Sequence, residues 1–146
     1  MTAAIFIEWN ESMFTGVKEI DRQHEVLVNV LNEIAAMGAE SPGQRRLEEV
    51  TLDLLAYALY HFETEERLMQ QSGYDRDQPG EAQAHVLQHR AFSDRVIALR
   101  AATAEGQERS QAALLQFLRD WLINHIGSTD RRLGDYISRS ISRARR

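Results

Sequence analysis

A histidine and a carboxylate stand four residues apart within residues 60–65, as His61 and Glu65. The surrounding sequence has helical periodicity, and residues at i and i+4 lie on one face of a helix. Both side chains can therefore point at one spot, as the ligands of metal sites in helical proteins do. Glu65 belongs to an acidic run, residues 63–66, that could also be a solvated face, but of that run only Glu65 is in register with His61. Because such a pair occurs by chance in many helices, its significance depends on the rest of the chain.

The sequence contains five histidines, and each falls on the apolar face of a predicted helix: His24, His61, His85, His89 and His125. A single histidine on such a face is usually a core residue that is hydrogen-bonded to a neighbour. Burying five imidazoles in one small core without a shared partner would leave several polar groups unsatisfied at a high cost in free energy. A metal accepts their lone pairs best, and His85 and His89 form a second i, i+4 pair.

Asp130 is the second carboxylate that could complete such a site. It lies five residues after His125, beyond Gly127, a glycine that could let the backbone turn the carboxylate inward. It could also pair with Arg131 or Arg132, or cap the final helix. The residues alone leave this choice open.

The donor atoms indicate the kind of metal. The chain has no cysteine, which excludes disulfides, thiolate-bound zinc and iron–sulfur clusters. Five imidazoles and two carboxylates exceed the needs of one zinc ion, or of a mononuclear iron site with two histidines and one carboxylate. A ferritin-like di-iron site would use Glu-x-x-His motifs, which this sequence lacks. A histidine-rich dinuclear iron site fits the donor set best.

Long amphipathic helices must position these side chains. Apolar residues recur at spacings of three and four, and glycine or proline interrupts the pattern between the periodic segments. The helices are predicted at these residues: 19–37, 44–71, 81–104, and a fourth from about 107. The connection from Ser72 to Gly80 is expected to be a polar loop. We therefore predict an all-α fold, an up-down-up-down four-helix bundle with an N-terminal extended arm and a short C-terminal helix.

The two ends of the chain are expected to differ from the bundle. Residues 1–14 have no helical period, so we expect an extended arm whose apolar residues pack onto the helices, followed by a turn at Gly16. Gly127 is expected to disturb the fourth helix. Residues 139–146 are basic and form either a solvated tail or a docking site for an anionic surface. The expected organisation is a single domain with these bounds: domain 1–146, N-terminal arm 1–18, basic tail 139–146.

Composition narrows the classes of function. The 146 residues are 43% hydrophobic and 27% charged, which is an ordinary balance for a soluble domain with a real core. No apolar run approaches the roughly 20 residues that a membrane span needs. The first residues lack the build of a secretory signal, so we expect a cytoplasmic protein. A net charge of −5 gives no reason to expect nucleic-acid binding.

With these residues identified, the chain resembles the hemerythrin family, in particular a single-domain bacteriohemerythrin, over nearly its whole length. The following stretches carry the resemblance: Trp9, Gly16-Val17, Ile20-Asp21-Arg22-Gln23-His24, His61-Phe62-Glu63-Thr64-Glu65, His85-Val86-Leu87-Gln88-His89, and Trp121-Leu122-Ile123-Asn124-His125-Ile126 with Asp130. All seven ligand positions of the family pattern are filled, in order. One departure is Leu133, where many relatives have a tyrosine, and this is not a ligand position.

The resemblance implies two non-haem iron ions, Fe2+ or Fe3+, with a bridging oxide or hydroxide. The implied ligands are His85, His89 and His125 for one ion, His24 and His61 for the other, and Glu65 and Asp130 as bridges. If both ions are octahedral, one position stays open on the ion with two histidines, and dioxygen would bind there. The residues expected to form an apolar pocket around it are Leu122, Phe62, Trp121 and Ile126.

The resemblance thus implies reversible dioxygen binding for storage, transport or delivery, with dioxygen and an oxygen-consuming enzyme as partners. The alternative is an oxygen or redox sensor whose iron state is read by a signalling protein. The first function is favoured because no output domain is attached. An enzymatic function ranks third, since no positioned acid or base is evident near the open position, and we expect the protein not to be an enzyme.

Overall fold

The computed structural model describes residues 7–39, 44–104 and 108–144, and within them the side chains of 7–36, 49–101 and 113–141. The described part of the chain is almost entirely helical and contains no strand, which confirms the all-α prediction. The elements, in chain order, are η1 (Glu11–Met13), α1 (Lys18–Ala39), α2 (Gln44–Ser72), α3 (Tyr74–Asp77), α4 (Pro79–Ala104), α5 (Glu108–Asn124), η2 (His125–Asp130) and α6 (Arg131–Ala144).

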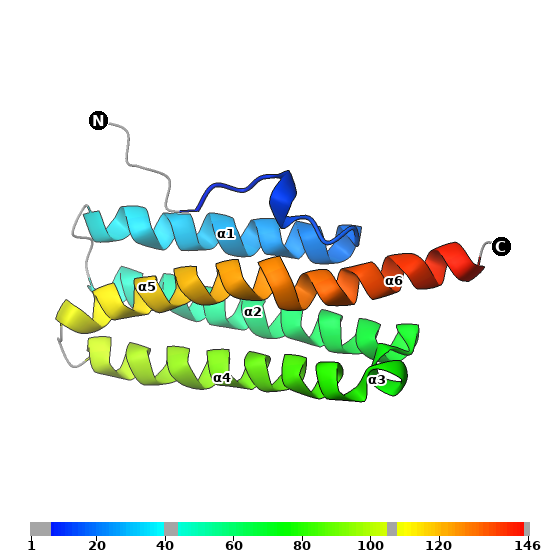
Figure 1. Cartoon of the computed structure of the whole chain (residues 1–146). Coiled ribbons are helices and arrows are strands. Elements are labelled where there is room, and N and C mark those ends of the chain that lie inside the picture. Colours follow the sequence, from blue (N-terminus) through cyan, green and yellow to red (C-terminus); the bar gives the residue numbers. More distant parts are fainter. Residues whose placement is uncertain (1–6, 40–43, 105–107, 145–146) are drawn as a thin grey trace.

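The four long helices α1, α2, α4 and α5 form the predicted bundle (Figure 1). Each of α2, α4 and α5 packs against the helix before it in this series, and α5 returns to contact α1, so the bundle is closed. Helix α6 continues the line of α5 and projects beyond the ends of the other helices (Figure 1). None of the helices in the described residues combines the length and the apolarity that crossing a bilayer requires.

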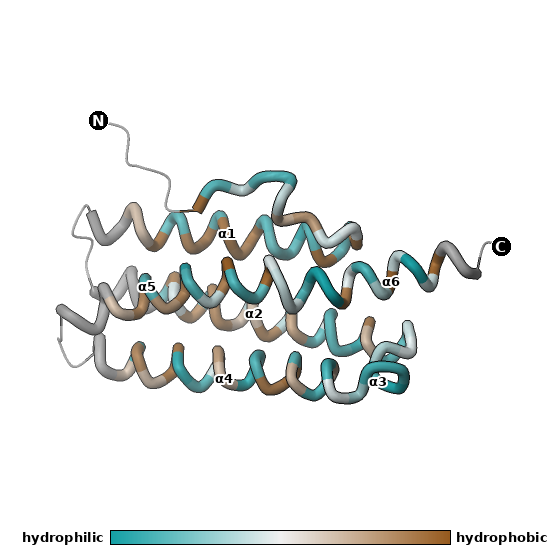
Figure 2. Tube along the Cα trace, in the orientation of Figure 1, coloured by the Kyte–Doolittle hydropathy of each residue, from teal (hydrophilic) through white to brown (hydrophobic). Residues whose placement is uncertain are grey.

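Apolar residues recur along each of the four long helices (Figure 2), and each helix buries a stripe of them in the interior. The stripes bury two separate apolar cores. The larger core contains Leu31, Leu54, Phe62, Phe92, Val96, Leu118 and Ile126, among others. The smaller core, near the start of α1, consists of Ile20, Met69, Tyr74, Ala82, Leu133 and Ile137.

The N-terminal arm follows the prediction in part. Ile7 is buried and Trp9 packs on the larger core, as expected for apolar residues of such an arm. The arm is not extended throughout, because a 3-10 turn at Glu11–Met13 interrupts it, with the Asn10 side chain as its N-cap. Phe14 remains 46% exposed and does not pack fully onto the helices. Part of the predicted arm, residues 1–6, lies outside the described residues.

The prediction of a polar loop after α2 was wrong. Gly73, with φ of +84°, ends α2 as predicted, but the one-turn helix α3 follows at once. Its first residue, Tyr74, is only 3% exposed because its ring completes the smaller core. Helix α4 begins at Pro79 rather than at Glu81, since a proline in the first turn sacrifices no intrahelical hydrogen bond.

The fourth helix is not broken at Gly127. It widens into the π-helix η2 and continues directly as α6, so the disturbance is at the predicted place but takes another form. Gly127 does not have the left-handed φ that Gly16 and Gly73 adopt among the described glycines. A Cβ atom at Gly127 would meet nothing within 4 Å. The turn therefore depends on the wider helical winding and not on the glycine.

Helix α6 is held close to the N-terminal arm. A Cβ atom at Gly134 would lie 2.4 Å from the backbone oxygen of Thr15, so only glycine permits this approach. The arm is fixed in turn by Asp21, whose carboxylate accepts hydrogen bonds from the Thr15 amide at 2.7 Å, the Thr15 hydroxyl at 2.8 Å and the Gly16 amide at 3.2 Å. This contact holds α6 against the N-terminal arm.

Candidate metal centre

The seven predicted ligand residues converge in one buried layer between the two apolar cores, and each is at most 3% exposed. They fall into two overlapping groups, in each of which the ligand atoms lie within 4.8 Å of one another. One group is Glu65, His85, His89, His125 and Asp130, and the other is His24, His61, Glu65 and Asp130. Both carboxylates are common to the two groups, which separates the histidines into three and two.

Two kinds of helix place these side chains. The pair His61 and Glu65 on α2 has the i, i+4 spacing that puts both residues on one face of an α-helix. His125 and Asp130 are five residues apart, and in an α-helix that spacing would separate them by about 140° around the axis. The π-helix η2 has a wider turn, in which residues five apart approach each other. This winding brings Asp130 to the cluster.

The ligand atoms face one another at short range. His61 Nε2 lies 2.5 Å from a Glu65 oxygen, and His24 Nε2 lies 2.7 Å from Asp130 Oδ2. His85 Nε2 lies between the two carboxylates, 3.0 Å from Glu65 Oε2 and 2.9 Å from Asp130 Oδ1. His125 Nε2 is also 2.9 Å from Asp130 Oδ1.

These contacts are ion pairs between the histidines and the two carboxylates. In the described part of the chain, the Nε2 atoms of all five histidines and the four oxygens of the two carboxylates are buried without a hydrogen-bond partner. Buried polar atoms are normally paired, so a set of lone pairs aimed at one volume is costly unless something accepts them. Nitrogen and oxygen donors in this number suit metal cations, and sulfur is absent from the set. The cluster is therefore suited to hold metal.

The electrostatics of the cluster favour positive charge between the carboxylates. Burial lowers the pKa of His85, but the adjoining Asp130 and Glu65 outweigh it and raise the pKa to about 9. Burial and then the neighbouring His85 and His125 lower the pKa of His89 to about 2. Burial alone would raise the pKa of Asp130, yet His125 and the other close contacts hold it well below its usual range. Asp130 therefore stays ionised, and a metal cation would take the place of the proton on His85.

A glutamine from α1 orients His61. The Nδ1–H group of His61 donates to Gln23 Oε1 at 2.7 Å, which leaves the Nε2 lone pair directed at the cluster. Gln23 in turn donates through Nε2 to the hydroxyl of Thr64 at 3.1 Å. Such outer partners fix the tautomer and the ring orientation of a metal-binding histidine.

A glutamine from α4 orients His125 in the same way. The Nδ1–H group of His125 donates to Gln88 Oε1 at 2.7 Å, and the hydroxyl of Thr129 donates to the same oxygen at 2.9 Å. Sequence reasoning missed both glutamines, although a signal was present. Each immediately precedes a cluster histidine, in Gln23-His24 and again in Gln88-His89, while it supports a histidine of a different element.

Aromatic rings cover one side of the cluster. Phe62 stacks on His89 with ring centroids 3.9 Å apart and an interplanar angle of 11°. Trp121 stacks on His125 at 4.2 Å and 13°. Of the four residues predicted to form an oxygen pocket, these two therefore lie against the three-histidine group. The other two, Leu122 and Ile126, are buried in the larger core.

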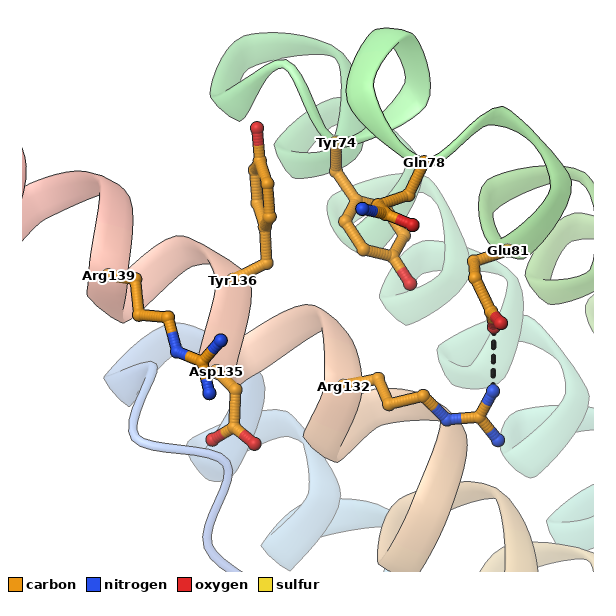
Figure 3. Close-up of a pocket in the computed structure, with 7 residues that line it drawn as sticks. All are labelled: Tyr74, Gln78, Glu81, Arg132, Asp135, Tyr136 and Arg139. Carbon is orange, nitrogen blue, oxygen red and sulfur yellow. Dashed lines mark hydrogen bonds and ion pairs between the residues drawn. The ribbon is translucent and has the colours of Figure 1, made fainter.

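A hollow of about 270 Å³ lies at the end of the molecule between α3, α4 and α6 (Figure 3). Tyr74 and Tyr136 line it, and Arg132 closes one side through a 2.6 Å ion pair with Glu81. No cluster residue lines this hollow, so it is distinct from the metal layer. The ion pair ties α6 to α4 two residues after Asp130.

Comparisons with known proteins agree with this geometry. Residues 15–137 match the family model described as the hemerythrin HHE cation binding domain. The chain is 32% identical to a bacteriohemerythrin of Pseudomonas aeruginosa (strain LESB58) over 92% of this chain and 83% of that protein. It is 31% identical to a bacteriohemerythrin of Methylococcus capsulatus (strain ATCC 33009 / NCIMB 11132 / Bath) over 89% of this chain and 95% of that one. A crystal structure of wild-type hemerythrin is similar, with a TM-score of 0.78 and 27% identity over 91% of this chain and 98% of the other.

Proposed function

Because the chain belongs to the hemerythrin family, we propose that it binds dioxygen reversibly at a non-haem di-iron centre. The proposed ligands are His85, His89 and His125 on one iron, His24 and His61 on the other, and Glu65 and Asp130 bridging both. A solvent-derived oxide or hydroxide completes the bridge. When bound, this centre would lend electrons to dioxygen and take them back when dioxygen leaves unchanged.

One observation carries the proposal: the two groups of potential ligands overlap in the two carboxylates and in nothing else. Glu65 and Asp130 each have two oxygens, and each carboxylate faces histidines of both groups. That arrangement supports two ions that share both carboxylates, rather than one ion with surplus ligands. Five histidines, two bridging carboxylates and a bridging oxygen then leave one octahedral position open, on the ion with two histidines.

The apolar residues near the cluster would keep the bound dioxygen away from water. We assign this role to the predicted pocket residues Leu122, Phe62, Trp121 and Ile126, which the larger core buries or contacts. A dry pocket keeps protons away from the bound oxygen. Protonation would let the oxygen leave in reduced form, and the binding would no longer be reversible. Leu122 lies three residues, about one helical turn, before His125, so its side chain shares the helix face that looks into the cluster.

We propose storage or delivery of dioxygen to an oxygen-consuming enzyme as the physiological role, in the cytoplasm and with residues 1–146 acting as one domain. We favour a binding function over an enzymatic one, because the family resemblance implies dioxygen binding and we assign no catalytic acid or base to the open position. A sensor function is the second candidate. It is supported by the continuity of η2 with α6, which connects Asp130 directly to a projecting helix (Figure 1).

The decisive experiment combines metal analysis with optical spectroscopy. The purified protein should hold two irons per chain and no haem. The reduced protein should develop an absorption band in air and lose it again when oxygen is removed. One iron per chain, or two zinc ions after expression with ample iron, would exclude the di-iron centre.

Leu122 provides a separate test of the dry pocket. Leu122→Asn should keep its iron but shorten the lifetime of the oxygenated band, because a polar side chain brings a proton source to the site. Leu122→Ala should act in the same direction by admitting water. Unchanged lifetimes in both variants would mean that Leu122 does not line the pocket.

A further inference from the structure

A groove on the outer surface between α2 and α4 reaches the metal layer. It has a volume of about 410 Å³, and His89 lies at its floor beside Phe62. His89 is 3% exposed, and its Nδ1 atom has no hydrogen-bond partner among the described residues. The nearest charged group, a Glu66 oxygen, is 3.7 Å away. The groove thus ends on the outward nitrogen of a residue whose other nitrogen faces the cluster.

The rim of this groove, which we call the α2–α4 groove, combines apolar and acidic side chains. Leu59, 46% exposed, supplies apolar surface. Glu63, Glu66 and Asp94 supply three carboxylates, against a single arginine, Arg90. The rim is therefore net negative, as is the whole chain with its charge of −5. A surface that mixes apolar and acidic side chains suits a partner of opposite charge in a small, short-lived complex.

We propose that the α2–α4 groove is the docking site of a positively charged electron-donor protein, which reduces the metal centre through His89. This inference rests on the proposed di-iron function, because dioxygen binds to Fe2+ and oxidation in air leaves Fe3+. Two electrons restore the centre, one for each ion. The donor loses one electron in each of two encounters, and a bridging oxide takes one proton from solvent to become hydroxide.

The position of the groove explains why electrons would enter there. The imidazole of His89 spans the distance from the groove floor to the cluster, and the Phe62 ring stacked on it at 3.9 Å extends the contact. The hollow at the far end, in contrast, is lined by no cluster residue. A donor seated in the α2–α4 groove is therefore separated from the proposed iron by one side chain.

Docking can be tested without any redox chemistry. We would record NMR spectra of the protein loaded with zinc(II), which does not change oxidation state, during titration with hexaamminechromium(III) as a cationic probe. Backbone amide signals of Glu63, Arg90 and Asp94 should broaden first. Broadening centred on another acidic surface would overturn the assignment of the groove.

Matched variants then test electron entry. The double variant Glu63→Gln/Asp94→Asn should abolish the selective broadening. It should also slow reduction of the iron-loaded ferric protein by ferrous cytochrome c, a basic donor, by about tenfold at low ionic strength. Asp53→Asn, also exposed on α2 but outside the groove, should change neither result.

The two proposals fail separately. An unchanged rate of reduction in the double variant would overturn the docking site even if the protein contains two irons. A protein with the wrong metal content would overturn the di-iron function, while the zinc titration would still report whether a cationic probe prefers the groove. Reduction by dithionite, a small anionic reductant, should be at least as fast in the double variant as in the unchanged protein, because the removal of two carboxylates weakens its repulsion.

Discussion

Two histidine–carboxylate pairs serve the same cluster from different kinds of helix. His61 and Glu65 occupy ordinary α-helical positions on α2, whereas His125 and Asp130 lie at the two ends of the π-helix η2. Each histidine is nevertheless held by a glutamine from a neighbouring helix, Gln23 for the first and Gln88 for the second. The hydrogen bond that orients the imidazole ring is thus alike in both pairs. The pairs differ only in the helical winding between the histidine and its carboxylate. The positions of the ligand atoms are therefore constrained by the cluster, whereas the helical winding that brings them there can differ.

The largest effect should come from removing either carboxylate. Glu65→Ala and Asp130→Ala should each lower the metal content far more than His24→Ala, because each carboxylate belongs to both ligand groups and His24 to only one. We expect the two carboxylate variants to be alike, although one comes from an α-helix and the other from a π-helix. Metal analysis after purification measures this. Equal metal contents in Glu65→Ala and His24→Ala would count against a bridging role for Glu65.

The next effect concerns the backbone that follows the π-helical pair. Gly134→Ala would place a Cβ atom 2.4 Å from the Thr15 backbone oxygen, so α6 or the arm must move. We expect a loss of about 3 kcal/mol in the free energy of unfolding, measured with denaturant. Gly127→Ala is the matched control, since a Cβ there meets nothing within 4 Å, and it should be neutral or slightly stabilising. Equal destabilisation by both variants would remove the special role of the α6–arm contact.

The glutamines should have a smaller effect, and a similar one in both pairs. Gln23→Ala and Gln88→Ala each remove the acceptor of a histidine Nδ1–H group. Loss of such a partner typically weakens metal binding by about 10- to 100-fold. Competition with a chelator of known affinity measures the change. A large effect at one glutamine and none at the other would mean that the two pairs are not equivalent.

The threonines should give the smallest effects, and here the pairs should differ. Thr64→Val leaves the buried Nε2 group of Gln23 without its acceptor, which should cost about 1–3 kcal/mol of stability. Thr129→Val leaves Gln88 Oε1 still bonded to His125, so the loss should be about 1 kcal/mol or less. Thermal unfolding of the two variants should rank them in this order, and the reverse order would contradict the assigned hydrogen bonds.

Sequence reasoning could predict whatever depends on regular helical spacing. The register of Leu54, Phe92 and Leu118 follows from spacings of three and four, and these residues are buried as that register requires. The same rule placed His61 with Glu65. Helical spacing alone could not decide between the alternatives for Asp130, because five residues correspond to the wrong face of an α-helix and a π turn has no periodic signature.

Other features depended on contacts between distant segments. Gln23 and Gln88 look like ordinary polar residues until the helices that carry their partners are brought together. The helix α3 has only four residues, too few to show a period, and Tyr74 is buried only because the smaller core exists. The close approach of Gly134 to Thr15 likewise cannot be read from either segment alone.

The rod formed by α5, η2 and α6 has a mechanical consequence. Helix α6 contacts the arm at Gly134, four residues after Asp130, and its far end projects beyond the other helices (Figure 1). Asp130 lies four residues from that point and Ala144 ten, so at equal rise per residue the lever ratio is about 2.5. If α6 tilts as a rigid helix about this contact, its end at Ala144 moves about 2.5 times as far as the backbone at Asp130, and in the opposite direction.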